Sequence, residues 1–255
     1  MLRAPCFVVS DAHLGPAPAD AERSLLELLS LARTQAKSVV LNGDVFDFWF
    51  EWRHVMPRTG FRVLAALAAL RDAGVEVLWI AGNHDCWGGE ILTRDVGVTY
   101  QVGPWRGELA GWRTLIEHGD GLREKEDAPY LRLRAVLRNP FAIRAFRWLH
   151  PDLATGIALR SSHTSRNMRP RDGGEGLRRV ALERLRAEPV LELYVFGHTH
   201  ASVTGRADTG GVYANPGAWM DEPTFLRVTP ERVELVRLAG MSVSVLQSLE
   251  RSFRS

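Results

Sequence analysis

The sequence predicts an α/β fold, because apolar segments that fit buried strands alternate with segments that fit helices. Strands are predicted at residues 5–10, 38–41 and 75–80, with helical spacing of apolar residues between them. This alternation is typical of parallel strands joined by helical crossovers. Each of the three strands also ends at a polar motif, and such sheets bind ligands at the carboxyl ends of their strands. We therefore expect a site along one edge of this sheet.

Two helices are predicted between these strands. The first begins near Asp20, and four leucines form its apolar face (Leu25, Leu28, Leu29 and Leu31). The second covers residues 58–73 and ends at Gly74, which fits the C′ position of a helix. Its apolar residues recur at intervals of three (Phe61, Leu64, Leu67 and Leu70).

The later part of the chain has shorter predicted elements. Strands are expected at residues 98–102, 113–117 and 191–196, turns at 103–104 and 107–111, and a helix at 176–187. Short strands follow through Val212 and Tyr213, and a hairpin is predicted over residues 225–238. The last segment, 241–255, is predicted to be a docked helix because its apolar residues have helical spacing (Val243, Leu246, Leu249 and Phe253).

Residues 122–171 differ in composition from the rest of the chain. They combine many arginines with few acidic residues, and they include large apolar side chains such as Phe141, Phe146 and Trp148. We interpret this segment as a helical insertion in a core formed by residues 1–121 and 172–240. Nucleic acid would suit the arginines but would not need the apolar side chains, so no nucleic-acid partner is expected.

Length and composition are those of a globular protein. The chain has 255 residues, 45% of them hydrophobic and 24% charged, and its two cysteines cannot form a disulfide framework. No stretch reaches the roughly 20 apolar residues that a membrane span needs. The N-terminus leads directly into the first strand, which leaves no room for a signal peptide. We therefore expect a cytoplasmic protein.

Five polar motifs at strand ends predict a metal centre. Two-metal hydrolases need about three protein ligands for each ion and one shared carboxylate. Seven side chains fit these roles (Asp11, His13, Asp44, Asn83, His118, His198 and His200), and five of the eight histidines lie at strand ends. Asp11 and His13 are two residues apart, as are His198 and His200, so an extended backbone would direct each pair to one side. Oxygen and imidazole ligands suit Mn, Fe, Zn or Ni, and we expect two Mn²⁺ ions.

The charge of such a centre favours an anionic substrate. Two divalent ions bring +4 and the carboxylates of Asp11 and Asp44 bring −2, so the cluster keeps about +2 and would attract a phosphate diester or a pyrophosphate. A single Asp-x-His motif is more often a turn than a ligand pair, so the prediction depends on finding all five motifs together. Asp47 and Asp120 flank candidate ligands, and we expect them to hydrogen-bond to ligating histidines or to backbone rather than to a metal.

The order of the motifs (Asp-x-His, Gly-Asp, Gly-Asn-His-Asp, His-Gly-Asp and Gly-His-Thr-His) resembles that of the calcineurin-like metallophosphoesterases. The resemblance implies two packed mixed sheets with helices outside. It assigns one ion to Asp11, His13, Asp44 and His200 and the other to Asp44, Asn83, His118 and His198. It also implies that His84 is a general acid or a transition-state stabiliser, and that Asp85 orients it.

A narrower resemblance involves the segments around Asp44, Asp120, Asp127, Tyr130 and residues 147–153. These look like the UDP-2,3-diacylglucosamine diphosphatase family of lipid A synthesis, whose helical lid holds two acyl chains. The resemblance implies attack of a metal-bound hydroxide on the pyrophosphate, with release of UMP and 2,3-diacylglucosamine 1-phosphate. It also implies a lipid-linked nucleotide sugar as substrate and peripheral contact with the cytoplasmic face of the inner membrane. Many members have arginine where this chain has His84.

Candidate substrate contacts come from the loop after Asp44 and from the insertion. Five aromatic residues lie within seven positions (Phe46, Phe48, Trp49, Phe50 and Trp52). Core packing is expected to take two or three of them, and we name Phe46 and Trp49 as groove candidates. The resemblance implies further substrate contacts (Asn83, His84, Asp127, Tyr130, Arg160 and Ser162).

Two alternatives remain open. The first is a metallophosphoesterase that acts on a soluble nucleotide, a phosphodiester or a phosphoprotein. The second is a binding protein that keeps the fold but has lost catalysis, which the complete set of seven ligands disfavours.

Overall fold

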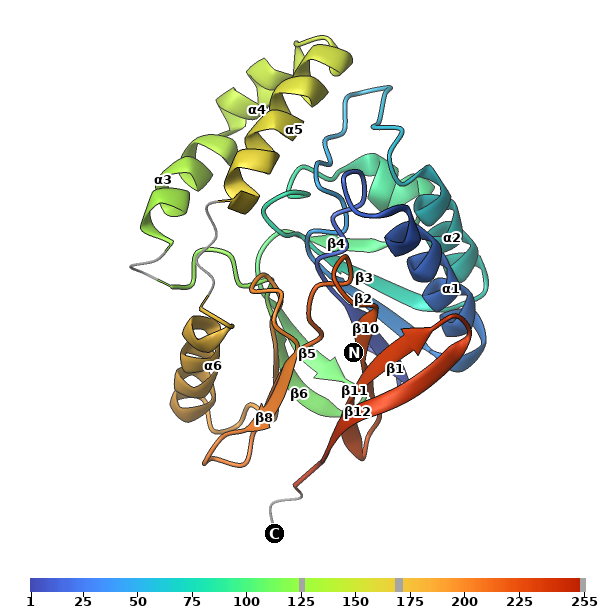
Figure 1. Ribbon diagram of the computed structural model, residues 1–255, viewed down its shortest axis with the longest axis vertical. Coiled ribbons are helices and arrows are strands. Elements are labelled where there is room, and N and C mark those ends of the chain that lie inside the picture. The colour runs from blue at the N-terminus through green and yellow to red at the C-terminus, as the bar shows by residue number, and fades with distance from the viewer. Residues whose placement is uncertain (124–126, 168–171, 253–255) are drawn as a thin grey trace.

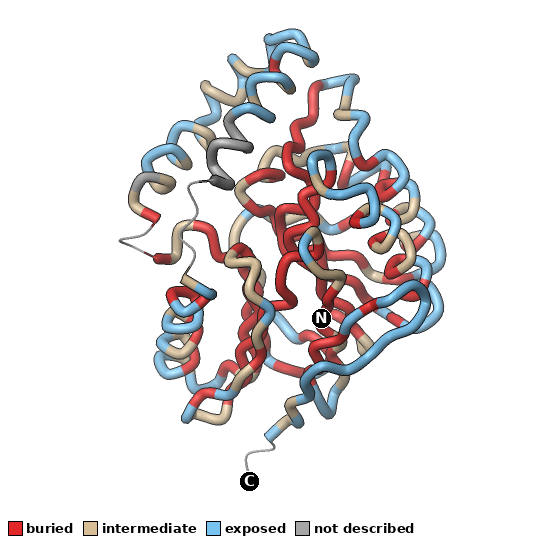
Figure 2. The backbone as a smooth tube through the Cα atoms, in the orientation of Figure 1, coloured by how far each residue is buried: buried red, intermediate tan, exposed pale blue. Residues whose placement is uncertain are grey.

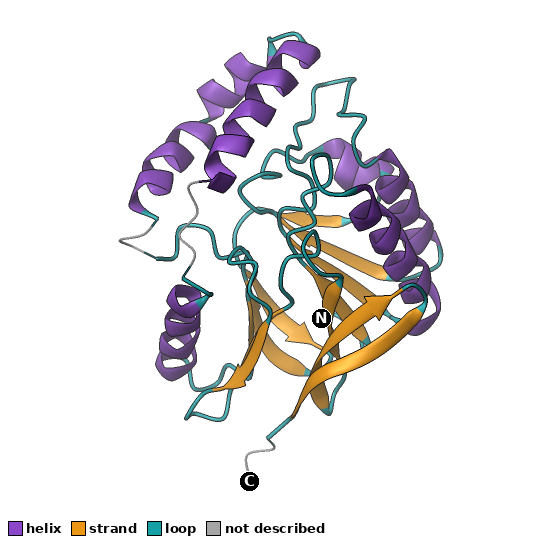
Figure 3. Ribbon diagram, in the orientation of Figure 1, coloured by secondary structure: helices purple, strands orange, loops and turns teal. Residues whose placement is uncertain are grey.

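The structure is a computed structural model that describes residues 1–123, 127–167 and 172–252, without the side chains of residues 129 and 161–167. Two mixed sheets pack face to face with helices on their outer faces, as Figures 1 and 3 show. The fold class expected from the motifs is thereby confirmed.

The larger sheet has seven strands in the order β12-β11-β10-β1-β2-β3-β4. Its four strands β1 to β4 are parallel, whereas β10 runs antiparallel to β1 and continues into an antiparallel meander. The bounds are β1 (Cys6–Val9), β2 (Ser38–Asn42), β3 (Glu76–Ile80), β4 (Thr99–Gln101), β10 (Thr224–Val228), β11 (Arg232–Ala239) and β12 (Ser242–Glu250).

The smaller sheet has five strands in the order β5-β6-β7-β9-β8. Its central strands β6, β7 and β9 are parallel, and the edge strands β5 and β8 are antiparallel to their neighbours. The bounds are β5 (Trp105–Leu109), β6 (Trp112–Ile116), β7 (Leu193–Val195), β8 (Val203–Arg206) and β9 (Val212–Asn215).

Three apolar layers hold the sheets and helices together. Side chains such as Val8, Val40 and Val195 fill the space between the sheets. A second layer lies under α1 (Ala19–Gln35) and α2 (Phe61–Asp72), and a third lies under α6 (Glu175–Ala187). Figure 2 shows the buried residues concentrated in the two sheets. These layers fix the relative positions of the strand ends on which the site is built.

Helices α3 (Ala128–Leu137), α4 (Pro140–Arg147) and α5 (Pro151–Asn167) lie beyond the sheets, within the segment predicted as an insertion (Figure 1). The remaining short helix is a π-helix, η1 (Ile91–Asp95). Among the described residues, no helix combines the length and the apolar character needed to cross a membrane.

A buried ion pair joins the two connections between the core and these three helices. The guanidinium of Arg123 donates to Asp127 Oδ1 at 2.8 Å, at the start of α3, and lies 3.4 Å from Asp172 Oδ2, just before α6. Asp172 in turn accepts hydrogen bonds from the backbone N–H groups of Gly174 and Gly176. Because Arg123 is only 6% exposed, this pair is largely shielded from water.

Two predicted elements are wrong. Residues 107–111 were expected to form a turn, but β5 includes Gly107 and pairs with β6. The expected helix at 241–255 is the strand β12 over its described part, and residues 253–255 lie outside the described residues. In β12 the register shifts so that Val236 pairs with Val245 and Leu235 with Gln247, which leaves Leu246 as an extra residue. This bulge interrupts the period of two, so the apolar residues have a spacing that resembles a helix.

We predict that Phe46→Ala lowers the free energy of unfolding by about 3–5 kcal/mol, because the ring is fully buried and its loss leaves a cavity. Phe61→Ala is the matched control, since Phe61 is 61% exposed and its truncation should change stability by no more than about 0.5 kcal/mol. Denaturant unfolding monitored by circular dichroism measures both values. Equal effects of the two substitutions would contradict the burial of Phe46.

Candidate metal centre

All five predicted motifs meet between the carboxyl ends of neighbouring parallel strands. Asp11 and His13 follow β1, Asp44 follows β2, and Asn83 and His84 follow β3 in the larger sheet. The remaining candidate ligands follow β6 and β7, which are adjacent in the smaller sheet (His118, His198 and His200). The face-to-face packing of the two sheets thus brings together side chains that are far apart in the sequence.

The backbone reverses sharply at most of these positions. Five candidate ligands have a positive φ: Asp11 (55°), His13 (42°), Asp44 (53°), His198 (65°) and His200 (61°). Only one other non-glycine residue in the described chain shares this feature. The expected extended geometry at Asp11-x-His13 and His198-x-His200 is therefore wrong, and left-handed turns direct these side chains inward instead. Such backbone is uncommon outside glycine and tends to concentrate at functional sites.

Asp44 lies at the centre of the cluster. Its Oδ2 atom is 3.2 Å from Nε2 of His118, 3.6 Å from Nε2 of His13 and 4.0 Å from Nε2 of His84. Its Oδ1 atom accepts a hydrogen bond from the backbone N–H of His84 at 2.9 Å. Asp44 is fully buried. One carboxylate therefore faces imidazoles from both sheets.

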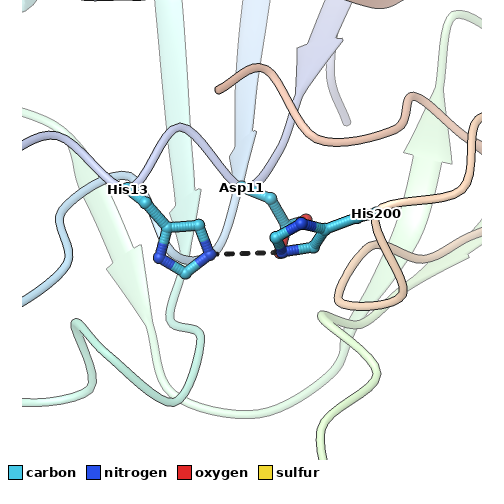
Figure 4. Close-up of side chains that lie close together, drawn as sticks. All are labelled: Asp11, His13 and His200. Atoms are coloured by element: carbon cyan, nitrogen blue, oxygen red, sulfur yellow. Dashed lines mark ion pairs between the residues drawn. The ribbon is translucent and has the colours of Figure 1, made fainter. Parts of the chain in front are cut away.

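Three groups of side chains at the centre could each hold an ion, and the third consists of His13, Asp44 and His84. Asp11, His13 and His200 form the first, with Asp11 Oδ1 3.5 Å from Nε2 of His200 and 3.8 Å from Nε2 of His13. Figure 4 shows the side chains of Asp11, His13 and His200 directed toward one another. The second group contains Asp44, His118 and His198, and the ligand atoms in each group lie within 4.8 Å of one another.

Further polar contacts surround these side chains. Nδ1 of His118 faces the carbonyl oxygen of Asn42 at 2.8 Å, and Nδ1 of His13 faces Oδ1 of Asp47 at 3.4 Å. The other oxygen of Asp11 accepts from Ser10 Oγ and from the backbone N–H of His198. Asp47 therefore lies beside a candidate ligand histidine.

The electrostatics of the site favour positive charge. Burial opposes ionisation of Asp44, but the surrounding imidazoles outweigh it and hold the pKa of Asp44 well below its usual range. Burial opposes protonation of His118, but the carboxylates of Asp44 and Asp11 raise its pKa to about 10. Burial and the charge of Asp44 raise the pKa of Asp85 to about 7. Buried carboxylates that draw protons onto a neighbouring imidazole would also attract cations, which compete with those protons.

The residues present fit a pair of divalent ions. Oδ1 of Asp11 and Oδ1 of Asn83 are buried and have no hydrogen-bond partner among the described residues. Buried acceptors in native proteins nearly always have a partner, so an ion between these atoms would account for their arrangement. Mixed carboxylate, amide and imidazole donors match the chemistry of transition-metal ligands.

Glycine is required where the strand-end loops approach one another. A Cβ atom on Gly82 would overlap Oδ1 of Asp44 and lie 2.6 Å from the backbone nitrogen of Asp44. A side chain at position 82 would therefore displace the central carboxylate.

The hydrogen-bond partners of the Asp85 carboxylate differ from the prediction. The carboxylate of Asp85 accepts hydrogen bonds from the backbone N–H groups of Gly82 (2.7 Å) and Val45 (2.9 Å) and from Trp79 Nε1 (3.2 Å). Asp85 thus joins the loops after β2 and β3, and the prediction that it orients His84 is wrong.

The His84 ring is held by the carbonyl oxygen of Asp47, 2.9 Å from Nδ1. Because a carbonyl can only accept, the proton lies on Nδ1, and Nε2 faces Asp44.

An apolar cavity of about 360 Å³ opens beside Asn83 and His84. Its walls come from the loop after Asp44, from Trp87 and from the helices α3, α4 and α5 (Phe48, Phe50, Tyr130, Leu133, Val136, Leu137, Ala142, Ile143, Phe146, Ile157 and Ala158). The sequence reasoning missed most of these helix residues, because helical spacing alone does not distinguish a cavity wall from core.

The prediction that Phe46 and Trp49 line a groove is wrong. Both are fully buried in the core beneath α1 and α2, and their rings stack with centroids 4.9 Å apart. The chain bends at residues 47 and 48, after which Phe48 and Phe50 line the cavity while Trp49 stays in the core. The aromatic loop therefore does border the cavity, but through different rings.

The remaining expected contacts have mixed positions. Tyr130 lines the cavity, and its hydroxyl donates to Oδ2 of Asp120 at 2.5 Å. Asp127 is buried in the pair with Arg123 and is not among the cavity residues. Arg160 is exposed on α5, and the side chain of Ser162 lies outside the described residues.

Comparisons with known proteins agree with this geometry. A model of the calcineurin-like phosphoesterase family matches residues 4–202. A UDP-2,3-diacylglucosamine hydrolase of Porphyromonas gingivalis is 33% identical over 223 residues, which are 79% of this chain and 85% of that protein. A protein of the same name from Pectobacterium carotovorum is 28% identical over 234 residues, covering 89% and 96% of the two chains. Both relatives support the narrower resemblance predicted from the motifs.

One solved structure supports the fold. Vacuolar Protein Sorting 29 from Cryptosporidium parvum superposes with a TM-score of 0.50 at 15% identity, covering 97% of each chain. At this identity the likeness concerns the arrangement of sheets and helices alone.

Proposed function

Because this chain belongs to the calcineurin-like phosphoesterase family, we propose that it hydrolyses the pyrophosphate of UDP-2,3-diacylglucosamine to UMP and 2,3-diacylglucosamine 1-phosphate. The observation that carries this proposal is the apolar cavity that opens directly beside the candidate metal residues. The chain is a metal-dependent hydrolase, and its relatives carry the name of this activity.

We assign one divalent ion to Asp11, His13, Asp44 and His200, and a second to Asp44, Asn83, His118 and His198. Asp44 is the shared ligand in this assignment, supported by its central position between the two groups. Bound ions would supply positive charge for the phosphoryl oxygens and lower the pKa of an attacking water. We propose Mn²⁺ as the metal.

The protein side chains would bind and orient the pyrophosphate. Asn83 and His84 line the cavity, so they border both the metal residues and the space for the rest of the substrate. The bond from Nδ1 of His84 to the Asp47 carbonyl leaves Nε2 directed at the centre, where it can contact a phosphoryl oxygen. Its protonated form would stabilise the charge that develops on that oxygen.

The helices α3, α4 and α5 would act as a lid over the acyl chains, in keeping with the proposed insertion at 122–171. Aromatic rings of the core loop and the lid pack together: the centroids of Phe50 and Phe146 are 4.9 Å apart. Apolar walls suit hydrocarbon chains, which gain free energy on leaving water in proportion to the area buried. A soluble nucleotide would have no use for this lining.

The lid also carries exposed apolar side chains that suit contact with a membrane surface. Trp148 is 86% exposed and Phe141 is 82% exposed, and both lie close to arginines in the sequence, such as Arg144 and Arg147. Aromatic and cationic side chains together favour the interface of an anionic bilayer. We therefore propose that the protein acts peripherally at the cytoplasmic face of the inner membrane.

We predict that the protein with Mn²⁺ releases UMP from UDP-2,3-diacylglucosamine in mixed micelles, and that EDTA abolishes this release. Asp44→Asn should lower turnover about a hundredfold or more. Loss of a residue that only hydrogen-bonds to a metal ligand already lowers activity about 10- to 100-fold, and Asp44 is proposed to be a ligand itself. Asp72→Asn, at the exposed end of α2, is the control. Chromatography of UMP provides the measurement. Efficient hydrolysis of bis(p-nitrophenyl) phosphate without any release of UMP would refute the substrate assignment.

A charge placed in the cavity should affect the lipid substrate selectively. Ile157 lines the cavity and is 50% exposed, so Ile157→Glu should fold normally but raise KM for the diacylated substrate about tenfold, the equivalent of about 1.5 kcal/mol of lost apolar burial. Leu153→Glu is the matched control on the same helix, because Leu153 is 58% exposed and is not a cavity residue. Steady-state kinetics with the lipid and with bis(p-nitrophenyl) phosphate separate the effects. An equal loss for both substrates would argue against an acyl-chain site.

Removal of one exposed lid aromatic should weaken membrane binding. Trp148→Ser is expected to lower partitioning onto vesicles that contain anionic phospholipid about tenfold, because burial of a large apolar side chain contributes about 1.5–3 kcal/mol. Phe61→Ser, an exposed aromatic residue on α2, should leave partitioning unchanged. Co-sedimentation with the vesicles measures both. If the wild-type protein stays in the supernatant, peripheral binding through the lid is refuted.

A further inference from the structure

Asp221 contacts a candidate metal ligand from a loop that the sequence motifs did not mark. Its Oδ2 atom lies 3.3 Å from Nδ1 of His200. The Asp221 side chain is 61% exposed and that of His200 is 22% exposed, so the pair lies at the rim of the centre. His13, in comparison, is fully buried. His200 therefore has less protein around it than its neighbours, and an additional contact matters more for its orientation.

The contact repeats an arrangement seen at two other imidazoles of the centre. Nδ1 of His13 faces Oδ1 of Asp47, and Nδ1 of His118 faces the carbonyl oxygen of Asn42. A neutral imidazole has one N–H and one lone pair, so an acceptor at Nδ1 places the proton there. In His200 the lone pair of Nε2 then faces Asp11, whose Oδ1 atom is 3.5 Å away. That is the arrangement a metal ligand requires.

The loop that carries Asp221 is fixed to the backbone of the metal centre. The backbone N–H groups of Trp219 and Met220 donate to the carbonyl oxygens of Ser10 (3.1 Å) and Asp11 (3.2 Å). The indole of Trp219 is buried and donates to the carbonyl oxygen of Ala21 at 3.0 Å. An exposed carboxylate usually contributes little, but here its backbone is held in register with Asp11.

We propose that Asp221 is a positioning residue that sets the tautomer and orientation of His200 for one of the two metal ions. This inference rests on the proposed function, since it requires that Asp11, His13 and His200 bind an ion. In this role Asp221 would act through His200 rather than by contact with the substrate or the metal. Its loss should lower the affinity for one ion. The affinity for the other ion, bound through His118 and His198, should stay unchanged.

Calorimetric titration of the metal-free protein with Mn²⁺ tests the proposal. Wild-type protein should bind two ions, and Asp221→Ala should lower the affinity for one of them about tenfold. Loss of a residue that hydrogen-bonds to a metal ligand typically lowers metal affinity about 10- to 100-fold, and we expect the smaller effect because Asp221 and His200 are partly exposed. Asp221→Asn keeps an acceptor oxygen without the charge and should give an intermediate affinity. Glu222→Gln is the matched control, since Glu222 is the next residue and pairs with Arg237 at 2.6 Å instead.

The outcomes separate this proposal from the proposed function. Two ions in the wild type with unchanged affinities in both Asp221 variants would overturn the positioning role and leave the metal centre intact. A wild-type protein that binds no Mn²⁺ would overturn the metal centre and the role of Asp221 with it. An equal loss of affinity for both ions would indicate a general structural effect and also overturn the proposal. A lower midpoint of thermal unfolding for the metal-free Asp221→Ala protein would have the same meaning.

Discussion

The compensation of two buried carboxylates is the constraint on which the rest of this structure depends. Asp11 and Asp44 are fully buried, where an uncompensated charge would be very costly. Imidazoles from both sheets surround them, and these carboxylates raise the pKa of His118 despite its burial. The strands that deliver these side chains must therefore end at the same place, which explains why polar motifs follow five strands and why the loops between them are tightly packed.

Much of the fold and of the centre could be predicted from the sequence, because both depend on local signals. Apolar runs that stop at a glycine or an acid mark β1, β2 and β3, and the candidate ligands next to them do meet. The elements that were mistaken depend on distant partners instead. The bulge at Leu246 exists only because β12 pairs with β11. Whether Phe46 or Phe48 faces the cavity depends on how the loop turns at Asp47, which spacing does not reveal.

The hydrogen-bonding residues around the candidate ligands were the hardest to predict. Asp85 follows a histidine in the chain, yet its oxygens join two loops of the sheet edge. Asp221 lies 21 residues beyond His200 and outside the five motifs, but the anchoring of Trp219 brings it to the imidazole. A sequence pattern reports which residue types can bind a metal. The hydrogen bonds that orient them arise from the three-dimensional packing of loops, and they became visible only in the structure.

The ion pair of Arg123 has a consequence for how such enzymes diversify. Because one guanidinium reaches both Asp127 and Asp172, the chain leaves the core and returns to it at neighbouring points. A segment with adjacent ends can be replaced, lengthened or shortened without altering the sheets that carry the candidate metal ligands. The same core could therefore acquire a different substrate by exchange of the segment between these two aspartates, while the catalytic chemistry at the strand ends stays the same.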